Sequence, residues 1–270
     1  MQFTSAVVAT ALTLAMSQIG TSQAAIAAET MAAETTAAEI KVVSGGAFKQ
    51  VLSALVALYE KESGNRVDVT YQTVGQHLAL IRDGKEAFDV AVLTPAGIDG
   101  LAKEGKVVPG TRADLAKVGV GVVVKAGAPL PDISTDEAFR RALLAAKSVA
   151  YIDPKAGGSS GIYVAGLLKR LGIAEEVNAK AVLVQGGAVA DHVADGEAEI
   201  GVHQISEILP VAGVKLVGPL PADIQNFTVY SAGVGAAAKD AAAAKGFVEF
   251  LSGPHALPII KAKGMEPASS

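Results

Sequence analysis

Two patterns of hydrophobic residues, one typical of strands and one typical of helices, alternate along this chain. Short apolar runs such as EIKVVS and FDVAVLT are typical of strands, and the second run is nearly continuous, as in a parallel strand covered on both faces. Between these runs lie segments with apolar residues at helical spacing, for example Phe48, Leu52 and Tyr59 in AFKQVLSALVALYEKESG. Strands that alternate with helices predict an α/β protein built on parallel sheets.

Two strand-like passages, near residues 118–125 and 227–234, divide this alternation into two series. We therefore predict two lobes, each a mostly parallel sheet flanked by helices, joined by a two-strand hinge. Lobe 1 is predicted to comprise residues 40–120 and 232–270, and lobe 2 residues 121–231. In such open α/β arrangements the cleft at the strand ends is the expected place for a ligand.

The composition narrows the possible functions. The chain has 270 residues, of which 50% are hydrophobic and 19% are charged, and its net charge is −4. With no run of Lys or Arg, binding to nucleic acid is not expected. The absence of cysteine excludes disulfides, thiol catalysis and thiolate metal sites. No spacing of histidines or carboxylates indicates a metal site, and we expect neither a metal nor another cofactor.

The first residues resemble an export signal. AVVATALTLAM, residues 6–16, is apolar but too short to span a bilayer, and small residues follow it. We predict a signal peptide over residues 1–27, a disordered leader over residues 28–39 and a periplasmic location. No Lys or Arg precedes the apolar run, so an alanine-rich disordered tail is the alternative.

Four loops, each between a strand and a helix, are the candidate binding elements: residues 44–47, 73–76, 157–161 and 185–188. Free backbone N–H groups and the helix dipole make such positions favourable for an anion. Any one of these loops could equally be a tight turn that needs glycine. The candidate ligand-binding residues in them are Ser44, Gly45, Gly46, Ala47, Thr73, Gly75, Gln76, Gly158, Ser159, Ser160, Gly161 and Gln185.

Further candidates lie outside these loops. Tyr163 follows the third loop by one helical turn, and His203, Gln204 and Ser206 follow the apolar strand AEIGV. A histidine at a strand end can bind a carboxylate or move a proton. The alternatives are a packing role for Tyr163 and a loop-shaping role for His203, and we interpret Glu207 as capping or solvating the next turn.

Three segments resemble the periplasmic molybdate-binding-protein-like receptors of ABC transporters. They are the stretch from IKVVSGGAFKQ to FDVAVLT, the loop DPKAGGSSGIY and the segment GEAEIGVHQISEI, and the resemblance covers residues 40–267. It implies the type II periplasmic binding fold, a small anionic ligand, an ABC permease as partner and a monomeric receptor.

The departures from that family leave two functions open. Ala47 stands where a ligand-binding serine would align and Gly75 is bare, so the cage for a tetrahedral oxyanion is altered. The first function is a receptor that captures an oxyanion or a small carboxylate for an importer. A branch of the family implies the alternative, an aconitate isomerase that interconverts trans- and cis-aconitate by allylic proton transfer. In that case His203 is the candidate acid–base, assisted by Tyr163 or a serine.

Overall fold

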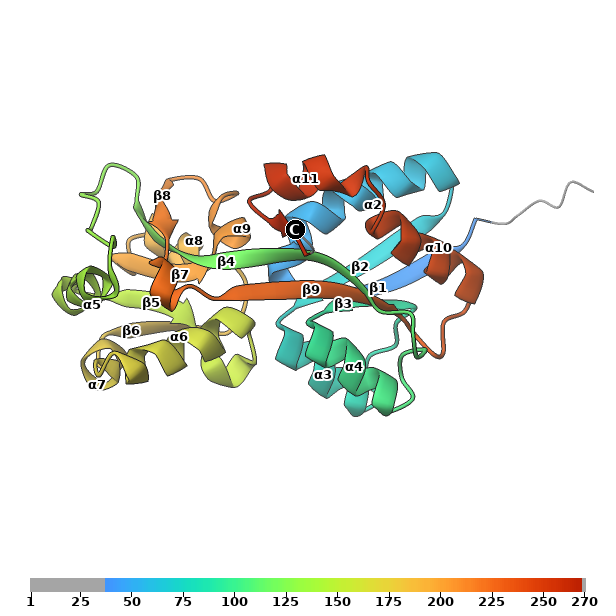
Figure 1. Cartoon of the computed structure of the whole chain (residues 1–270), viewed down its shortest axis with the longest axis horizontal. Coiled ribbons are helices and arrows are strands. Elements are labelled where there is room, and N and C mark those ends of the chain that lie inside the picture. The colour runs from blue at the N-terminus through green and yellow to red at the C-terminus, as the bar shows by residue number, and fades with distance from the viewer. Residues whose placement is uncertain (1–36, 269–270) are drawn as a thin grey trace, which may run out of the picture. The chain divides into compact units, whose positions relative to one another are not determined.

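The computed structural model describes residues 37–268, so the predicted signal peptide and most of the predicted leader lie outside the described residues. The chain forms two lobes in which strands alternate with helices, as predicted (Figure 1). The strands are β1 (Glu39–Gly45), β2 (Arg66–Gln72), β3 (Val90–Leu93), β4 (Ala113–Lys125), β5 (Val149–Ile152), β6 (Ala181–Val184), β7 (Ile200–Gln204), β8 (Val214–Pro219), β9 (Phe227–Val234) and β10 (Glu266–Pro267).

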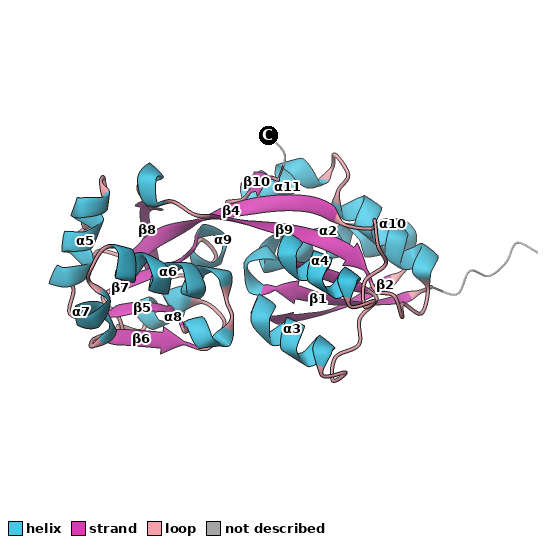
Figure 2. Ribbon diagram, turned by 60° about the horizontal axis from the view of Figure 1, so that its bottom comes forward, coloured by secondary structure: helices cyan, strands magenta, loops and turns pink. Residues whose placement is uncertain are grey.

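Helices cover both sheets (Figure 2). The α-helices are α2 (Lys49–Ser63), α3 (Val74–Arg82), α4 (Pro95–Lys103), α5 (Asp136–Ala145), α6 (Ser159–Arg170), α7 (Ala174–Asn178), α8 (Val189–Ala194), α9 (Ile205–Ile208), α10 (Ala241–Leu251) and α11 (Ala256–Ala262). Short 3-10 helices are η1 (Gly46–Phe48), η2 (Pro154–Ala156) and η3 (Ala222–Ile224). None of the helices in the described part of the chain is long and apolar enough to cross a membrane.

Each lobe has a parallel core of three strands. In lobe 1, β1 pairs in parallel with β2 and β3, and in lobe 2, β5 pairs in parallel with β6 and β7. The remaining strands, β4, β8, β9 and β10, pair antiparallel. The sheets are therefore less uniformly parallel than predicted, because the strands that link the lobes run against the parallel triplets.

Strands β4 and β9 connect the lobes, as the sequence predicted for a two-strand hinge (Figure 1). The first part of β4, up to Gly119, pairs with β9, whereas the part from Val120 pairs with β7. Gln225 marks this transition: its Oε1 accepts from the Val120 N–H at 2.9 Å and its Nε2 donates to the Val120 carbonyl at 3.0 Å. The lobe boundaries at residues 120/121 and 231/232 stay a prediction.

Separate hydrophobic cores hold the two lobes. The core of lobe 1 contains Phe48 and Leu52 together with Phe247 of α10, all fully buried. The main core of lobe 2 contains Phe139 and Leu167, which are also fully buried. Burial of a large side chain contributes about 1.5–3 kcal/mol to stability, so each lobe is stabilised by its own core. The loops between the lobes are therefore available for ligand binding.

Candidate ligand-binding site

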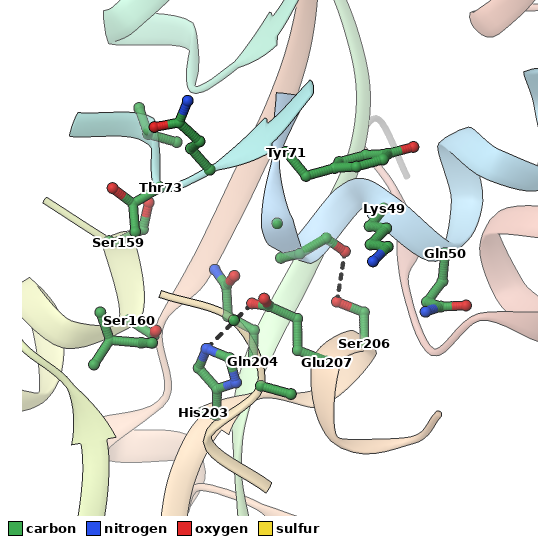
Figure 3. A pocket seen from close by; sticks show the side chains of 18 of the residues that line it. Lys49, Gln50, Tyr71, Thr73, Ser159, Ser160, His203, Gln204, Ser206 and Glu207 are labelled. Atoms are coloured by element: carbon green, nitrogen blue, oxygen red, sulfur yellow. Dashed lines mark hydrogen bonds and ion pairs between the residues drawn. The ribbon is translucent and has the colours of Figure 1, made fainter. Parts of the chain in front are cut away.

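A cavity of about 440 Å³ lies between loops of the two lobes (Figure 3). Lobe 1 contributes η1, the first turn of α2 and the passage from β2 to α3, while lobe 2 contributes the start of α6 and the passage from β7 to α9. Its lining residues are Gly46, Ala47, Lys49, Gln50, Tyr71, Gln72, Thr73, Val74, Ile152, Gly158, Ser159, Ser160, Gly187, Ala188, Asp191, His203, Gln204, Ser206, Glu207, Pro210, Val211 and Tyr230.

The structure brings more than half of the candidate site residues to this cavity. The candidates that line it are Gly46, Ala47, Thr73, Gly158, Ser159, Ser160, His203, Gln204 and Ser206. Those that do not are Ser44, Gly45, Gly75, Gln76, Gly161, Tyr163 and Gln185. The second group lies behind the cavity, along its rim or, in the case of Tyr163, directed away from it.

Packing explains why the first of these supporting residues are turned away. Ser44 is fully buried under η1, and its hydroxyl donates to the Gly45 carbonyl at 3.2 Å. Gly45 lies against the Tyr230 ring, since a Cβ there would come within 2.7 Å of it. Gly161 lies even closer to the backbone of Ile152. Glycine at positions 45 and 161 therefore permits close packing behind the cavity.

Tyr163 is directed away from the cavity. Its hydroxyl donates to the Ile224 carbonyl at 2.6 Å and accepts from Arg170 at 3.2 Å. Arg82 of α3 forms an ion pair with Glu104 at 2.8 Å. Both side chains therefore form contacts within their own lobe.

The lobes touch along one rim of the cavity through the second and third loops. The Gly75 N–H donates to the Gly157 carbonyl at 3.1 Å, and the Thr73 hydroxyl donates to the carbonyl of Ala156. Gln76 adds a bond from its Nε2 to the Gln185 carbonyl at 3.4 Å. A Cβ on Gly75 would lie 2.6 Å from the Gly157 Cα, so the two backbones meet directly. The structure therefore has the lobes in contact across the cleft.

The opposite side of the cavity is closed by α9, which packs on β4 and η1. The Ser206 hydroxyl donates to the Ala47 carbonyl at 2.8 Å. The Glu207 carboxyl lies over Gly46, where a Cβ would come within 2.8 Å of Oε1. The sequence interpretation of Glu207 as a residue that caps or solvates the next turn is therefore wrong. Its Oε2 lies 3.2 Å from Nε2 of His203 (Figure 3).

Burial shifts the pKa values of this pair in opposite directions. The side chains of His203 and Glu207 are 2% and 15% exposed. Burial lowers the pKa of His203 to about 3, and it raises the pKa of Glu207 to about 8 against the opposing effect of Lys49. At neutral pH the imidazole is therefore neutral and the carboxyl carries a proton.

Two buried polar atoms, one on His203 itself and one on the residue after it, have no hydrogen-bond partner. They are Nδ1 of His203 and Nε2 of Gln204. The Gln204 Oε1 accepts from the hydroxyl of Tyr230 at 3.2 Å, and burial raises the pKa of that hydroxyl. Unpaired buried polar groups cost stability, which is typical of a site that a ligand or water completes.

Sequence reasoning missed several polar lining residues, mainly Lys49, Gln50, Tyr71 and Asp191. Lys49 and Gln50 had a usable signal, since they form the first helical turn after the glycine loop SGGAF. Tyr71 and Asp191 had none, because nothing in a strand or a short helix indicates which residue borders a cleft. Among the described residues that line the cavity, Lys49 is the one Lys or Arg.

The family-model comparison decides the family. Residues 40–266 match the model described as bacterial extracellular solute-binding protein. The chain belongs to this family. Two curated relatives also match this solute-binding protein: an aconitate isomerase from a Pseudomonas species, 31% identical, with 84% of this chain and 87% of the relative covered, and the molybdate-binding protein ModA of Azotobacter vinelandii, 30% identical, with 83% and 88% covered.

A solved structure supports the same assignment. The periplasmic molybdate-binding protein of Azotobacter vinelandii is 25% identical, has a TM-score of 0.71, and covers 84% of this chain and 98% of its own. The two-lobed type II fold implied by the sequence resemblance is therefore confirmed. As a member of an extracellular family, the protein acts in the periplasm or outside the cell.

In the described residues, no group of three His, Cys, Asp or Glu side chains gathers in a way that could hold a metal ion. The cavity offers instead neutral donors: the Ser159 and Ser160 hydroxyls, the N–H groups at the start of α6 and the Gln204 amide. Lys49 adds a positive charge on the opposite side. Such a set can hold the oxygens of an anion by hydrogen bonds rather than by dense positive charge.

Proposed function

We propose that this solute-binding protein captures a small organic anion, of the size of a di- or tricarboxylate, in the cavity between its lobes. The observation that carries this proposal is the lining itself: Lys49 on one side faces the start of α6 and the Ser159 and Ser160 hydroxyls on the other. A ligand with a carboxylate at each end could bind Lys49 with one carboxylate and the start of α6 with the other. A ligand with a single charged group could bind only one of these two sides.

The volume of the cavity also favours a carboxylate over a tetrahedral oxyanion. At about 30 Å³ per water molecule, 440 Å³ corresponds to roughly 15 waters. A tetrahedral oxyanion has five heavy atoms, which would leave most of this space to solvent. Two further features weaken an oxyanion cage: Ala47 provides no hydroxyl, and the Thr73 hydroxyl is already donated to Ala156.

The proposal includes a partner and a location. The rim contacts between Gly75 and Gly157 and between Thr73 and Ala156 give the closed form a surface that an open form would lack. We propose that an ABC importer recognises this closed form. A monomeric protein, exported to the periplasm by a signal peptide over residues 1–27, is part of the same proposal.

A thermal-shift panel tests the proposal. The mature protein is heated with molybdate, tungstate, sulfate, phosphate, citrate, cis-aconitate or trans-aconitate. We expect a carboxylate to stabilise it; at a hundredfold excess over Kd the gain is about 2.7 kcal/mol, or roughly 5–11 °C for a chain of this size. Stabilisation by molybdate and tungstate alone would show that the ligand is an oxyanion. No response to any anion would overturn the binding function.

A second candidate function is the isomerase. It is favoured by the 31% identity to an aconitate isomerase and by the titratable His203–Glu207 pair in the cavity wall. The reaction removes a proton from the CH2 carbon of the tricarboxylate, spreads the negative charge over the allylic system and its carboxylate, and returns a proton to the other end. Preorganised donors such as Ser159 and Lys49 would stabilise that charge.

Proton NMR of trans-aconitate incubated with the protein in D2O tests this candidate. An isomerase would produce cis-aconitate and introduce deuterium at the allylic carbons at a rate proportional to protein concentration. Binding of trans-aconitate without either change would leave the receptor function alone.

A further inference from the structure

We infer that Glu207 is a neutral carboxylic acid in the ligand complex, so that the site captures its anion together with one proton. This inference deepens the proposed function and rests on it. It gives a binding role to a residue that the sequence analysis interpreted as capping or solvating a turn. It also gives the site a property, proton-coupled binding, that neither the fold nor the family requires.

The geometry leaves Glu207 little contact with solvent. Its side chain is 15% exposed, its Oε2 lies 3.2 Å from Nε2 of His203, and its Oε1 lies over Gly46. Glu207 also lines the cavity. Figure 3 shows the carboxyl between His203 and the η1 turn, directed toward the other lining side chains. A ligand in this cavity would therefore contact the carboxyl directly.

The charged and titratable groups around Glu207 do not supply enough positive charge to neutralise both an ionised carboxylate and a bound anion. His203 faces it from β7, Lys49 from α2 and Tyr230 from β9, and Asp191 and Tyr71 line the same cavity from α8 and β2. Of these groups, Lys49 is the one cation at neutral pH. An anion beside an ionised Glu207 would place two negative charges in a partly desolvated space against one lysine.

A proton on Glu207 removes this repulsion. Burial already raises the pKa of Glu207 to about 8 and keeps His203 neutral, since its pKa falls to about 3. The protonated carboxyl is then a hydrogen-bond donor, either to Nε2 of His203 or to a ligand oxygen. Because the ligand is negatively charged, its arrival raises the pKa of Glu207 further, and binding above pH 8 must take up a proton.

The other histidine–glutamate pairs in the described residues differ from this one. His77 and Glu86 lie 2.7 Å apart, and the second ring nitrogen of His77 lies 3.1 Å from the Ser44 carbonyl, so both nitrogens have partners. His192 and Glu197 form a surface pair, 34% and 57% exposed. Neither pair lines the cavity, and the surface pair provides a matched control.

The first measurement follows the side-chain carboxyls by carbon NMR in protein labelled with 13C at glutamate Cδ. Wild type, Glu207→Gln and the control Glu197→Gln are titrated without ligand and with saturating trans-aconitate or citrate. We expect one resonance that titrates near pH 8 in the free protein, moves to higher pH with the anion, disappears in E207Q and persists in E197Q. A Glu207 resonance that titrates in the ordinary carboxylate range in both states would overturn the inference.

The second measurement is calorimetry in buffers of different ionisation enthalpy. We expect the affinity of wild type and E197Q to fall about tenfold per pH unit above pH 8, with uptake of up to one proton. E207Q, which keeps a neutral hydrogen-bonding group, should bind with an affinity that is constant over this range. A wild-type affinity that is independent of pH up to 9 would contradict proton-coupled capture.

These results separate the two proposals. If no anion of the panel binds, the proposed function fails, and the ligand-free titration still decides whether Glu207 holds a proton. If an anion binds while Glu207 is ionised at pH 7, the binding function stands and the inference about Glu207 fails.

Discussion

The two contacts that close the cavity are built from different chemistry. On the rim, Thr73 and Gly75 meet Ala156 and Gly157 through backbone groups and one hydroxyl. On the side of α9, the Ser206 hydroxyl and the Glu207 carboxyl contact η1. The rim contact contains no titratable group, whereas the α9 contact contains one whose pKa is raised to about 8.

This difference suggests a division of labour. The rim contact depends on how closely two glycine backbones approach, so it should control whether the lobes close and be insensitive to pH. The α9 contact packs on the connecting strand β4, so it should control which ligand is accepted, through the proton on Glu207. Three predictions test whether closure and ligand chemistry separate in this way.

The largest effect is expected at the rim, from Gly75→Ala. The new Cβ would lie 2.6 Å from the Gly157 Cα, and both partners are backbone, so the lobes must separate for it to fit. Overpacking of this kind costs about 1–3 kcal/mol, which corresponds to a loss of about 5- to 150-fold in anion affinity. Calorimetry with the panel anion that binds best measures the loss.

Gly246→Ala is the control for this substitution. Gly246 is also helical, and a Cβ there has no atom within 4 Å, so anion affinity should be unchanged. If G75A binds as tightly as wild type at every pH, the rim contact does not control closure.

The second effect concerns the pH dependence of stability on the α9 side. Above pH 4.5 the unfolded chain loses a proton from Glu207 that the folded protein keeps up to about pH 8, so the free energy of unfolding falls as the pH rises. Below pH 6.5 the unfolded chain protonates His203 while the folded protein does not, so the same free energy falls as the pH drops. The two effects oppose each other between pH 4.5 and 6.5, and Glu207 acts alone above that.

Wild type should therefore lose up to about 2 kcal/mol between pH 6.5 and 8, since each pH unit contributes at most about 1.4 kcal/mol. Urea unfolding at these two pH values should show the loss in wild type and in E197Q, whereas E207Q should be nearly constant. An equal loss in E207Q would assign the effect to other groups and remove the chemical distinction between the two contacts.

The comparison also shows what the sequence could predict. The two-lobed fold followed from periodicity, because strands and helices are local patterns and a parallel sheet needs crossovers. The loops that carry Gly46, Thr73 and Ser159 to the cavity could be selected because a loop at the end of a parallel strand faces the cleft in such folds.

Sequence reasoning could not separate residues that face the cavity from those that support it. Ser44 and Ala47 are three positions apart in one loop, yet the first is buried beneath the turn and the second borders the cavity. Which side a loop residue faces depends on tertiary contacts such as that of Gly45 with Tyr230. The role of Glu207 was missed for the same reason, since its pKa depends on burial by segments far away in the chain.

The smallest effect is expected from Lys49→Met, which removes the one Lys or Arg that lines the described cavity and whose charge acts on Glu207. The Lys49 ammonium lies 5.5 Å from the centre of the Tyr71 ring, a cation–π contact that methionine also removes. We expect a loss of about 1 kcal/mol in anion affinity, or roughly fivefold, because a partly exposed charge is screened by solvent.

Since Lys49 opposes the burial effect on Glu207, its removal should also raise the pKa of Glu207 and move the fall in affinity to higher pH. Calorimetry of K49M against the surface control Lys245→Met measures both changes, and a fall in affinity at the same pH as in wild type would show that Lys49 and Glu207 act on the ligand independently.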